Sequence, residues 1–98
     1  MQTMTHRLMP DSQLVQLMAA GDRAARAELC DRHRLSVYAQ VYVALVDSDA
    51  AEQVVAETFD RAWHTASEFT PRAGSPLAWL SGIARALAER RRTATPSR

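Results

Sequence analysis

Two side chains that commonly ligate metal ions, Cys30 and His33, stand three residues apart in the sequence. On a helix this spacing places both on one face, where they could contact a single ion. A structural zinc site needs about four protein ligands, and the chain offers no second pair at such a spacing. The alternative is a partly buried thiol beside a surface histidine. We therefore expect neither a metal site nor a cofactor.

Acidic residues are concentrated in one short segment, which contains Glu52, Glu57 and Asp60. Carboxylates of this kind can act as general acids or bases. On an exposed helix face they are far more often solvated, or they form a docking surface for a partner. The chain has no glycine-rich phosphate loop, and its sequence supports no Ser/His/Asp arrangement. We predict that the protein is not an enzyme.

Basic residues are concentrated at the other end of the chain. Residues 1–71 carry six arginines and ten acidic residues, whereas residues 72–98 carry six arginines and one glutamate, and there is no lysine. The planar guanidinium group of arginine pairs with phosphate in a bidentate manner. The basic C-terminal third therefore suggests a nucleic-acid-binding face. A solvated basic tail is the alternative, and charge alone does not separate the two.

The composition predicts that helices position these residues. The chain of 98 residues has 47% hydrophobic residues, many of them alanine, with three glycines and four prolines, which favours helix over sheet. A single cysteine forms no internal disulfide bond, which favours a reducing cytoplasm. Residues 1–10 lack the continuous apolar stretch of a signal peptide, and the apolar run 37–46 is too short to span a bilayer. We expect a soluble, cytoplasmic protein that does not engage a membrane.

The first half of the chain predicts two helices. Asp11 is expected to cap a short helix that ends near Gly21, and Asp22 to cap a long helix over residues 23–46. Its predicted inward stripe consists of Leu35, Tyr38, Tyr42 and Leu45. Since its second half is apolar nearly all round, this helix should be central and buried on several sides. A β-strand is the rival prediction there, because valine and tyrosine favour strands.

The second half of the chain predicts two further helices separated by a loop. A capping box of Asp49 and Glu52 is expected to open a helix that ends near Ser67. Ser75 and Pro76 are strong start signals for the last helix. The predicted inward residues are Val55, Phe59, Ala62, Trp63 and Ala66 on the third helix, and Leu77, Leu80, Ile83, Ala84 and Leu87 on the fourth. We expect a compact all-α bundle of about four helices over residues 11–92, with flexible segments at 1–10 and 93–98.

The third and fourth predicted helices carry a specific pattern. The stretch DAAEQVVAETFDRAW, followed by EFTPRAGSPLAWLSGIAR, resembles region 2 of bacterial sigma factors of the extracytoplasmic-function (ECF) type. The upstream stretch MAAGDRAARAELCDRH is similar to the opening helices of that family. The resemblance covers about residues 11–92. It implies a transcription initiation domain that docks on the clamp helices of core RNA polymerase and binds and melts the promoter −10 element, chiefly through the non-template strand. It also implies an anti-sigma factor as a partner.

The resemblance assigns residues to both interfaces. The RNA polymerase-facing residues that it implies are Glu52, Gln53, Ala56, Glu57 and Asp60. The DNA-facing residues that it implies are Phe69, Arg72, Gly74, Ser75, Arg85, Ala86, Arg90 and Arg91. An aromatic ring and free backbone amides at a helix start suit an unstacked base, and arginines suit phosphates. Phe69 and Trp79 each have the alternative of simple packing in the core.

The sequence departs from the family pattern at contact positions. The family usually has aspartate at Gln53, glutamine at Ala56 and asparagine at Ala86, and Arg90 replaces an expected aspartate. These departures leave open a second function, a sigma-like protein-binding module (a decoy or a domain bound by an anti-sigma factor) without independent promoter recognition. A complete family member also has a second helical domain that reads the −35 element. No such segment follows residue 98, so the chain is either an excised domain or a protein without that domain.

Overall fold

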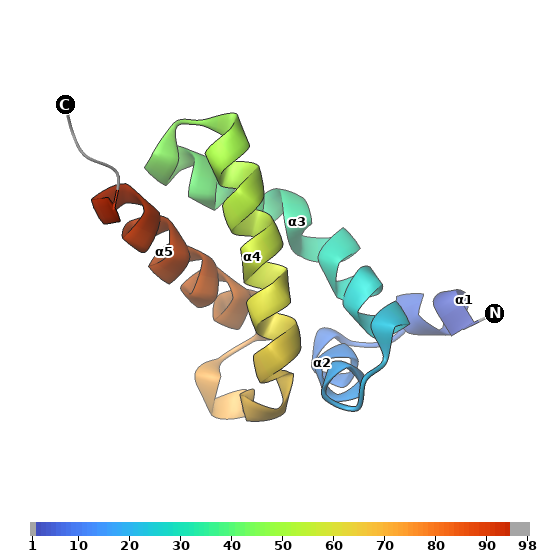
Figure 1. Ribbon diagram of the computed structural model, residues 1–98. Helices are drawn as coiled ribbons and strands as arrows, with labels where there is room; N and C mark the ends of the chain where they lie inside the picture. The colour runs from blue at the N-terminus through green and yellow to red at the C-terminus, as the bar shows by residue number, and fades with distance from the viewer. Residues whose placement is uncertain (1, 95–98) are drawn as a thin grey trace.

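The described part of the chain, residues 2–94 of the computed structural model, is built from helices (Figure 1). The α-helices are α1 (Gln2–Arg7), α2 (Asp11–Ala19), α3 (Arg23–Leu45), α4 (Ser48–Thr65) and α5 (Pro76–Ala94). Two 3₁₀ turns, η1 (Ala66–Glu68) and η2 (Pro71–Ala73), lie between α4 and α5. No strand occurs in residues 2–94, so the all-α prediction is confirmed and the strand alternative for the second half of α3 is wrong.

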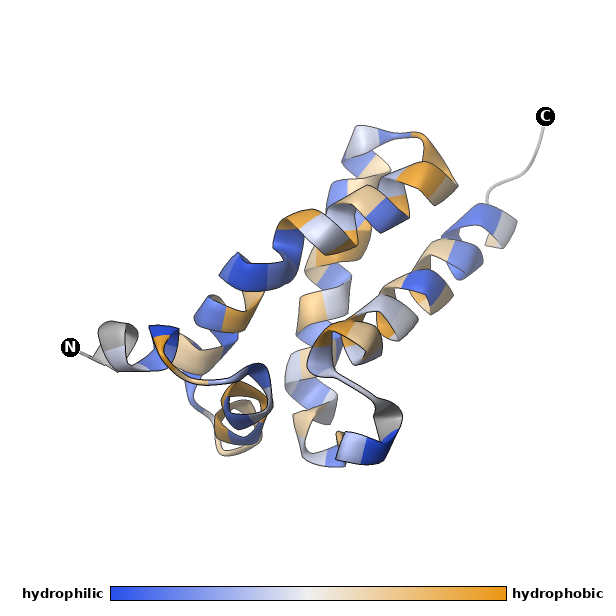
Figure 2. Ribbon diagram, turned by 180° about the vertical axis from the view of Figure 1, so that it is seen from behind, coloured by the Kyte–Doolittle hydropathy of each residue, from blue (hydrophilic) through white to orange (hydrophobic). Residues whose placement is uncertain are grey.

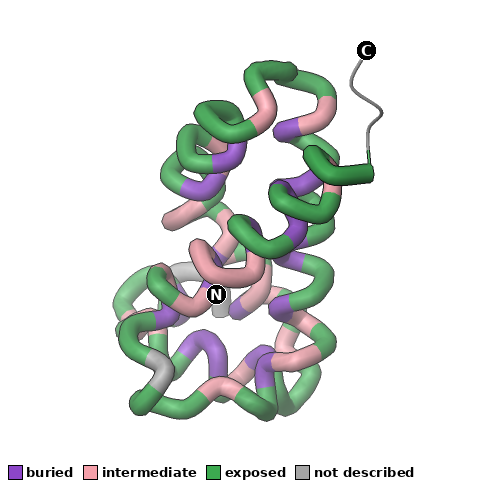
Figure 3. The backbone as a smooth tube through the Cα atoms, turned by 90° about the vertical axis from the view of Figure 1, so that its left-hand side faces the viewer, coloured by how far each residue is buried: buried purple, intermediate pink, exposed green. Residues whose placement is uncertain are grey.

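Helices α3, α4 and α5 contact one another pairwise and form the body of the domain, with α2 packed against α3 and η1, and α1 against α3 (Figure 1). The core lies between them, and Figure 3 shows the buried residues along the sides of the helices that face each other. Its largest fully buried side chains come from α2, α3, α4 and α5, namely Leu14, Val15, Met18, Leu29, Val37, Val41, Val54, Thr58 and Leu80. The core therefore depends on contacts between all four longer helices.

The buried face of α3 is only partly the predicted one, because Tyr38 and Leu45 are half-buried and pack against the core but the other two predicted residues do not. Leu35 is 72% exposed and Tyr42 is 40% exposed, whereas Ala25, Leu29, Val37 and Val41 are buried. The second half of α3 is apolar nearly all round, so its periodicity does not identify which side faces the core. It is also not buried on several sides, because Val43 and Val46 are 78% and 71% exposed. Figure 2 shows the apolar stretch at the C-terminal end of α3 and in the turn that follows.

Two of the four predicted helix caps are confirmed. The Asp22 carboxylate accepts a hydrogen bond from the backbone N–H of Ala25 (3.1 Å), and the Ser75 hydroxyl accepts one from Ala78 (3.1 Å). The other two predictions were wrong. Asp47 rather than Asp49 caps α4, with the N–H of Ala50 at 2.9 Å. Aspartates two residues apart both satisfy a cap pattern, and the sequence alone does not choose between them.

The predicted cap Asp11 has a different role. Its carboxylate accepts a hydrogen bond from Arg32 Nη1 (2.8 Å) and lies 2.6 Å from His33 Nε2, which ties α2 to α3. Burial opposes ionisation of this carboxyl, but the bonds from Arg32 and His33 outweigh it and hold the pKa of Asp11 below its usual value. Asp11 thus links α2 to α3 and does not cap the start of α2.

Residues 2–7 form a helix where none was predicted. His6 is only 4% exposed, and its Nε2 lies 2.9 Å from Asp22 Oδ2. Arg32 Nη2 donates to the backbone carbonyls of His6 (3.0 Å) and Arg7 (3.1 Å), which satisfies the C-terminal end of α1. These polar contacts join residues that are far apart in the sequence, so the apolar periodicity of residues 1–10 does not indicate them. At the other end, α5 includes residues 93 and 94, and the rest of the predicted flexible tail, 95–98, lies outside the described residues.

The turn between α3 and α4 contains an unusual backbone conformation. Val46 has φ 51° and ψ 42°, in the left-handed region, and its N–H donates to the carbonyl of Tyr42 (2.7 Å). Glycine is the residue that adopts this conformation most readily at a helix end. A β-branched residue there is strained.

Candidate functional site

All five residues predicted to face RNA polymerase are exposed on α4. They are Glu52, Gln53, Ala56, Glu57 and Asp60, and the buried residues of the same helix lie on its other side. Because α4 packs against α3 and α5 through that apolar side, its polar side faces away from the core. The structure therefore brings this predicted set together as one surface.

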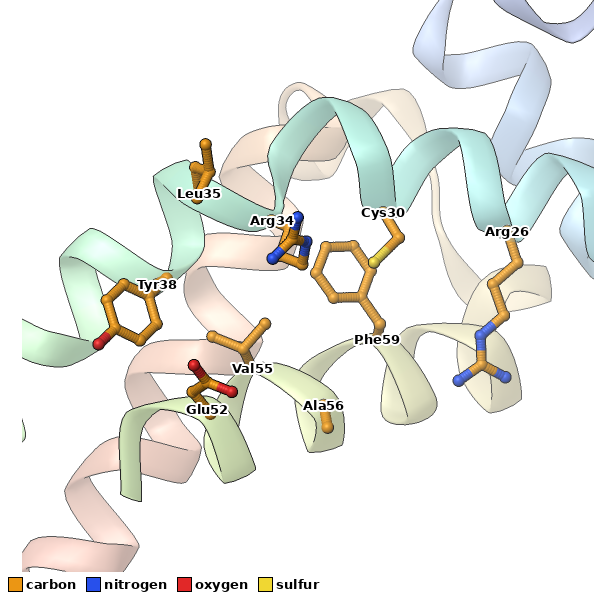
Figure 4. Close-up of a pocket in the computed structure, with 9 residues that line it drawn as sticks. All are labelled: Arg26, Cys30, Arg34, Leu35, Tyr38, Glu52, Val55, Ala56 and Phe59. Carbon is orange, nitrogen blue, oxygen red and sulfur yellow. The ribbon is translucent and has the colours of Figure 1, made fainter. Parts of the chain in front are cut away.

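A groove with a volume of about 580 Å³ lies between α3 and α4, beside this surface (Figure 4). Only Glu52 and Ala56 of the predicted set line it. The side chains of Arg34 from α3 and Glu52 from α4 extend into it (Figure 4). The complete lining is Arg26, Cys30, Arg34, Leu35, Tyr38, Glu52, Val55, Ala56 and Phe59. The groove thus has an apolar floor with charged groups of both signs.

The contribution of α3 to this groove was missed in the sequence. Arg26, Cys30, Arg34 and Tyr38 recur every four residues, which places them on one stripe of α3. That spacing is a usable signal, but the predicted inward stripe of α3 includes Tyr38, and no predicted site includes Arg26 or Arg34. The residues predicted from α4 therefore include only two of the groove's lining residues, and the lining from α3 was not predicted.

The possible metal pair is divided between two environments. Cys30 lines the groove, where burial raises the pKa of its thiol. His33 instead contacts Asp11 on α2. Within residues 2–94 no group of three or more histidine, cysteine or acidic side chains is arranged to hold a metal ion. The expectation of no cofactor stays a prediction.

A cluster of charged and aromatic side chains lies at one end of the α4 surface. The guanidinium carbons of Arg23 and Arg26 lie 5.8 and 5.6 Å from the centre of the Trp63 ring. Arg26 Nη2 is also 3.9 Å from Asp60 Oδ1. The Asp60 side chain is 62% exposed, so solvent screens this ion pair and it contributes little to stability. Asp60 remains accessible to a partner.

The loop residues predicted to face DNA lie in and beside the turn η2. Arg72, Gly74 and Ser75 are exposed, and Phe69 is half-buried. The Ser75 hydroxyl also caps α5, and Gly74 has φ 99°, a conformation that favours glycine. The segment between α4 and α5 contains the two 3₁₀ turns. These turns place the four residues at the start of α5.

Phe69 combines the two roles that the sequence left open. Its ring packs against Trp79, with the centroids 5.2 Å apart and the planes inclined at 53°, and both rings pack against the core. Both residues are only partly buried. The pair therefore supports the loop and still exposes some aromatic surface.

The α5 residues predicted to face DNA do not all have the same surroundings. Arg85, Ala86 and Arg90 are exposed, and within the described residues neither arginine makes a side-chain hydrogen bond or ion pair. Arg91 is half-buried, and its Nη2 donates to Oε1 of Gln53 on α4. A residue predicted to face DNA is thus bonded to a residue predicted to face polymerase.

Comparison with known proteins identifies this arrangement. The model of the family described as sigma-70 region 2 matches residues 29–95. This chain belongs to the sigma-70 region 2 family. The match includes α4, the loop and α5, which carry every predicted contact residue of the region 2 domain.

Relatives of the region 2 domain are ECF sigma factors, as the sequence resemblance predicted. The ECF RNA polymerase sigma factor SigK of Mycobacterium sp. (strain KMS) is 37% identical over 71 residues, which are 72% of this chain and 37% of that protein. SigK of Mycobacterium tuberculosis (strain ATCC 25618 / H37Rv) is 38% identical over 71 residues, 72% of this chain and 38% of that protein. The chain thus spans less than half the length of these relatives. Within residues 2–94, no helix has the length and apolar character needed to cross a membrane.

Proposed function

We propose that the region 2 domain acts in transcription initiation, docking on core RNA polymerase through α4 and the α3–α4 groove and binding the single-stranded promoter −10 element through the loop and α5. The observation that carries this proposal is the separation of charge on two adjacent helices. The exposed side of α4 is acidic, with Glu52, Glu57 and Asp60, whereas α5 exposes Arg85 and Arg90. Such a domain can bind a protein and a polyanion at the same time. The proposal involves no catalytic step and places the protein in the cytoplasm.

Exposed apolar side chains support the docking half of the proposal. The large hydrophobic residues with the most exposure on α3 and its following turn are Leu35, Tyr42, Val43 and Val46. Apolar surface that is rimmed by charge commonly marks a protein-binding site on a small domain. A helix of the polymerase clamp would cover it and place basic side chains near Glu52 and Glu57. With glutamine at position 53 and alanine at position 56, this contact has fewer charged and polar groups than the family pattern provides.

The chemistry of the loop and α5 supports the DNA half. Arg72, Arg85 and Arg90 are exposed and can pair with phosphates, which makes binding fall as salt rises. The exposed edge of the Phe69–Trp79 pair offers a stacking surface for an unstacked base. The backbone amides at the start of α5 favour an anion or a base edge.

A pull-down with core RNA polymerase tests the docking half. The Glu57→Lys variant reverses a charge on the exposed side of α4 and is expected to lose most of the bound polymerase. Gln16→Lys adds positive charge on the exposed side of α2 and is expected to bind like the wild type. Folded wild-type protein that retains no polymerase would disprove docking.

Fluorescence anisotropy with single-stranded oligonucleotides tests the DNA half. We expect binding that weakens with salt and that prefers a −10-like sequence over a scrambled sequence. The second candidate function is a protein-binding module, such as a domain held by an anti-sigma factor, without promoter recognition of its own. The exposed groove between α3 and α4 and the alanine at position 86 favour it. Polymerase or anti-sigma binding without any preference among oligonucleotides would support this second function.

A further inference from the structure

A stripe of exposed apolar side chains, here called the α3 stripe, runs along the side of α3 that faces away from the core. Its members recur at three- and four-residue spacing and are Leu35, Ala39, Tyr42, Val43 and Val46. Leu35, Val43 and Val46 are 72%, 78% and 71% exposed. The stripe is about 16 Å long, because a helix rises by 1.5 Å per residue. Apolar residues at this spacing on an exposed helix face form the seam of a helix pair.

The C-terminal part of the α3 stripe is held in position by the domain itself. The ring of Tyr42 stacks on that of Tyr38, with the centroids 6.0 Å apart and the planes inclined at 21°. Val46 keeps its exposed side chain at the end of the stripe in a left-handed backbone conformation. Backbone strain of this kind persists where the surrounding structure enforces it, and it is concentrated at functional sites. The stripe is therefore a preformed surface for a partner.

The two ends of the α3 stripe carry opposite charges. Arg34 directly precedes Leu35, is exposed, and makes no side-chain hydrogen bond or ion pair within residues 2–94. Asp47 directly follows Val46 and is also exposed. Two such stripes in parallel alignment would place like charges together, whereas antiparallel alignment places Arg34 of one copy beside Asp47 of the other. Asp31 lies one turn before Leu35, beyond the point at which the second chain turns away into α4.

We propose that the α3 stripe is a self-association surface, through which two copies of the domain pair as an antiparallel, two-fold symmetric dimer. A two-fold axis midway between positions 40 and 41 of α3 gives every member of the stripe an apolar partner. This register sets Leu35 against Val46, Ala39 against Tyr42, Tyr38 against Val43, and Arg34 against Asp47. A large ring then meets a small side chain at the centre, and the contact is self-complementary, as an isologous interface must be.

The dimer is expected to be weak and reversible. One helix face supplies far fewer residues than the roughly 20–30 per side of a standard interface. The inference does not rest on the proposed function, because self-association is a property of the domain alone. Leu35 and Tyr38 also line the groove between α3 and α4. A second copy would therefore cover part of the surface proposed for polymerase, and the two partners would exclude one another there.

Sedimentation velocity over a range of protein concentrations tests the self-association. The wild type should shift from monomer to dimer as its concentration rises from about 1 μM to about 1 mM. Val43→Glu should weaken the association at least tenfold, because it places a charge in the apolar seam of both copies. Gln40→Glu adds the same charge at an exposed position of α3 outside the stripe and should associate like the wild type. Circular dichroism checks that both variants fold.

Disulfide cross-linking in a Cys30→Ser background tests the antiparallel register. A mixture of Leu35→Cys and Val46→Cys chains should form cross-linked heterodimers, whereas Leu35→Cys alone should not, because its two thiols would lie about 16 Å apart along the helices and a disulfide needs Cα atoms within about 7 Å. Equally fast cross-linking of Leu35→Cys alone would overturn the antiparallel dimer. A folded wild type that stays monomeric up to about 1 mM, or a dimer unaffected by Val43→Glu, would overturn the inference. The polymerase pull-down reports on the proposed function separately.

Discussion

Replacing Arg32 by methionine should destabilise the domain far more than the same change at Arg34. Arg32 donates from Nε to Glu28 (2.9 Å) and from Nη1 to Asp11 (2.8 Å), and Nη2 reaches the two carbonyls at the end of α1. Arg34, two residues along the same helix, is exposed and makes no side-chain hydrogen bond or ion pair within the described residues. The two changes remove the same charge and the same length of side chain.

The expected magnitude follows from the groups that Arg32 leaves behind. Removing one partner of a buried ion pair costs about 3–5 kcal/mol. The side chain of Arg32 is 23% exposed, and those of Glu28 and Asp11 are 14% and 24% exposed, so solvent reduces this penalty. We expect a loss of about 2–3 kcal/mol in the free energy of unfolding, which corresponds to a fall of about 10–20 °C in Tm.

Urea denaturation followed by circular dichroism measures this difference. The Arg34→Met variant should stay within about 0.5 kcal/mol of the wild type. Amide hydrogen exchange should also show faster exchange in α1 and α2 of Arg32→Met than in α5. An Arg32→Met variant as stable as Arg34→Met would refute the view that this guanidinium group holds the N-terminal helices to α3.

Three further predictions concern titration and charge. The hydrogen bonds with His6 and with the N–H of Ala25 hold the pKa of Asp22 below its usual value, and bonds from Arg32 and His33 do the same for Asp11. The two carboxylates therefore stabilise the fold above about pH 3.9, and this stabilisation disappears as the pH falls toward their lower folded-state pKa values. Acid unfolding of Asp11→Asn should show a weaker dependence on pH in that range. Arg85→Gln and Arg90→Gln should each reduce the salt dependence of single-strand binding by about 0.7, and unchanged dependence would exclude a phosphate contact. Because burial raises the pKa of Cys30, its alkylation rate should rise only at a higher pH than that of a free thiol, which a pH series with iodoacetamide would measure.

Local signals predicted most of the helices. One unambiguous helix start is predicted at Gly21–Asp22 and another at Ser75–Pro76. The caps by Asp22 and Ser75 are both present. The buried face of α3 was only partly predicted, because apolar valine, tyrosine and alanine side chains lie on all sides of the second half of that helix. In such a case packing against the neighbouring helices decides which side of the helix is buried. This packing buries Val37 and Val41 and leaves Leu35 and Tyr42 exposed. Helix α1 was missed because its anchors, Asp22 and Arg32, are polar and lie 16 and 26 positions away from His6.

The candidate site was predictable where a helix presents one polar side. Exposure of the α4 residues followed from the opposite placement of Val55 and Phe59. The groove was not predictable, because it requires knowing which stripe of α3 lies beside α4. The bond between Gln53 and Arg91 joins residues from separate helices, and no local pattern links them. The resemblance places Gln53 in the RNA polymerase interface and Arg91 in the DNA interface, and both assignments stay predictions.

The left-handed turn residue Val46 makes the junction of α3 and α4 a locally frustrated element of the fold. A non-glycine residue in this conformation costs about 1–2 kcal/mol, and the valine side chain is 71% exposed, so it returns little packing energy to the core. Glycine would relax the backbone but would remove an apolar group from the surface beside Tyr42 and Val43. The isolated domain therefore retains a conflict between its backbone and its surface. Burial of that valine by another molecule would offset the backbone cost with packing energy.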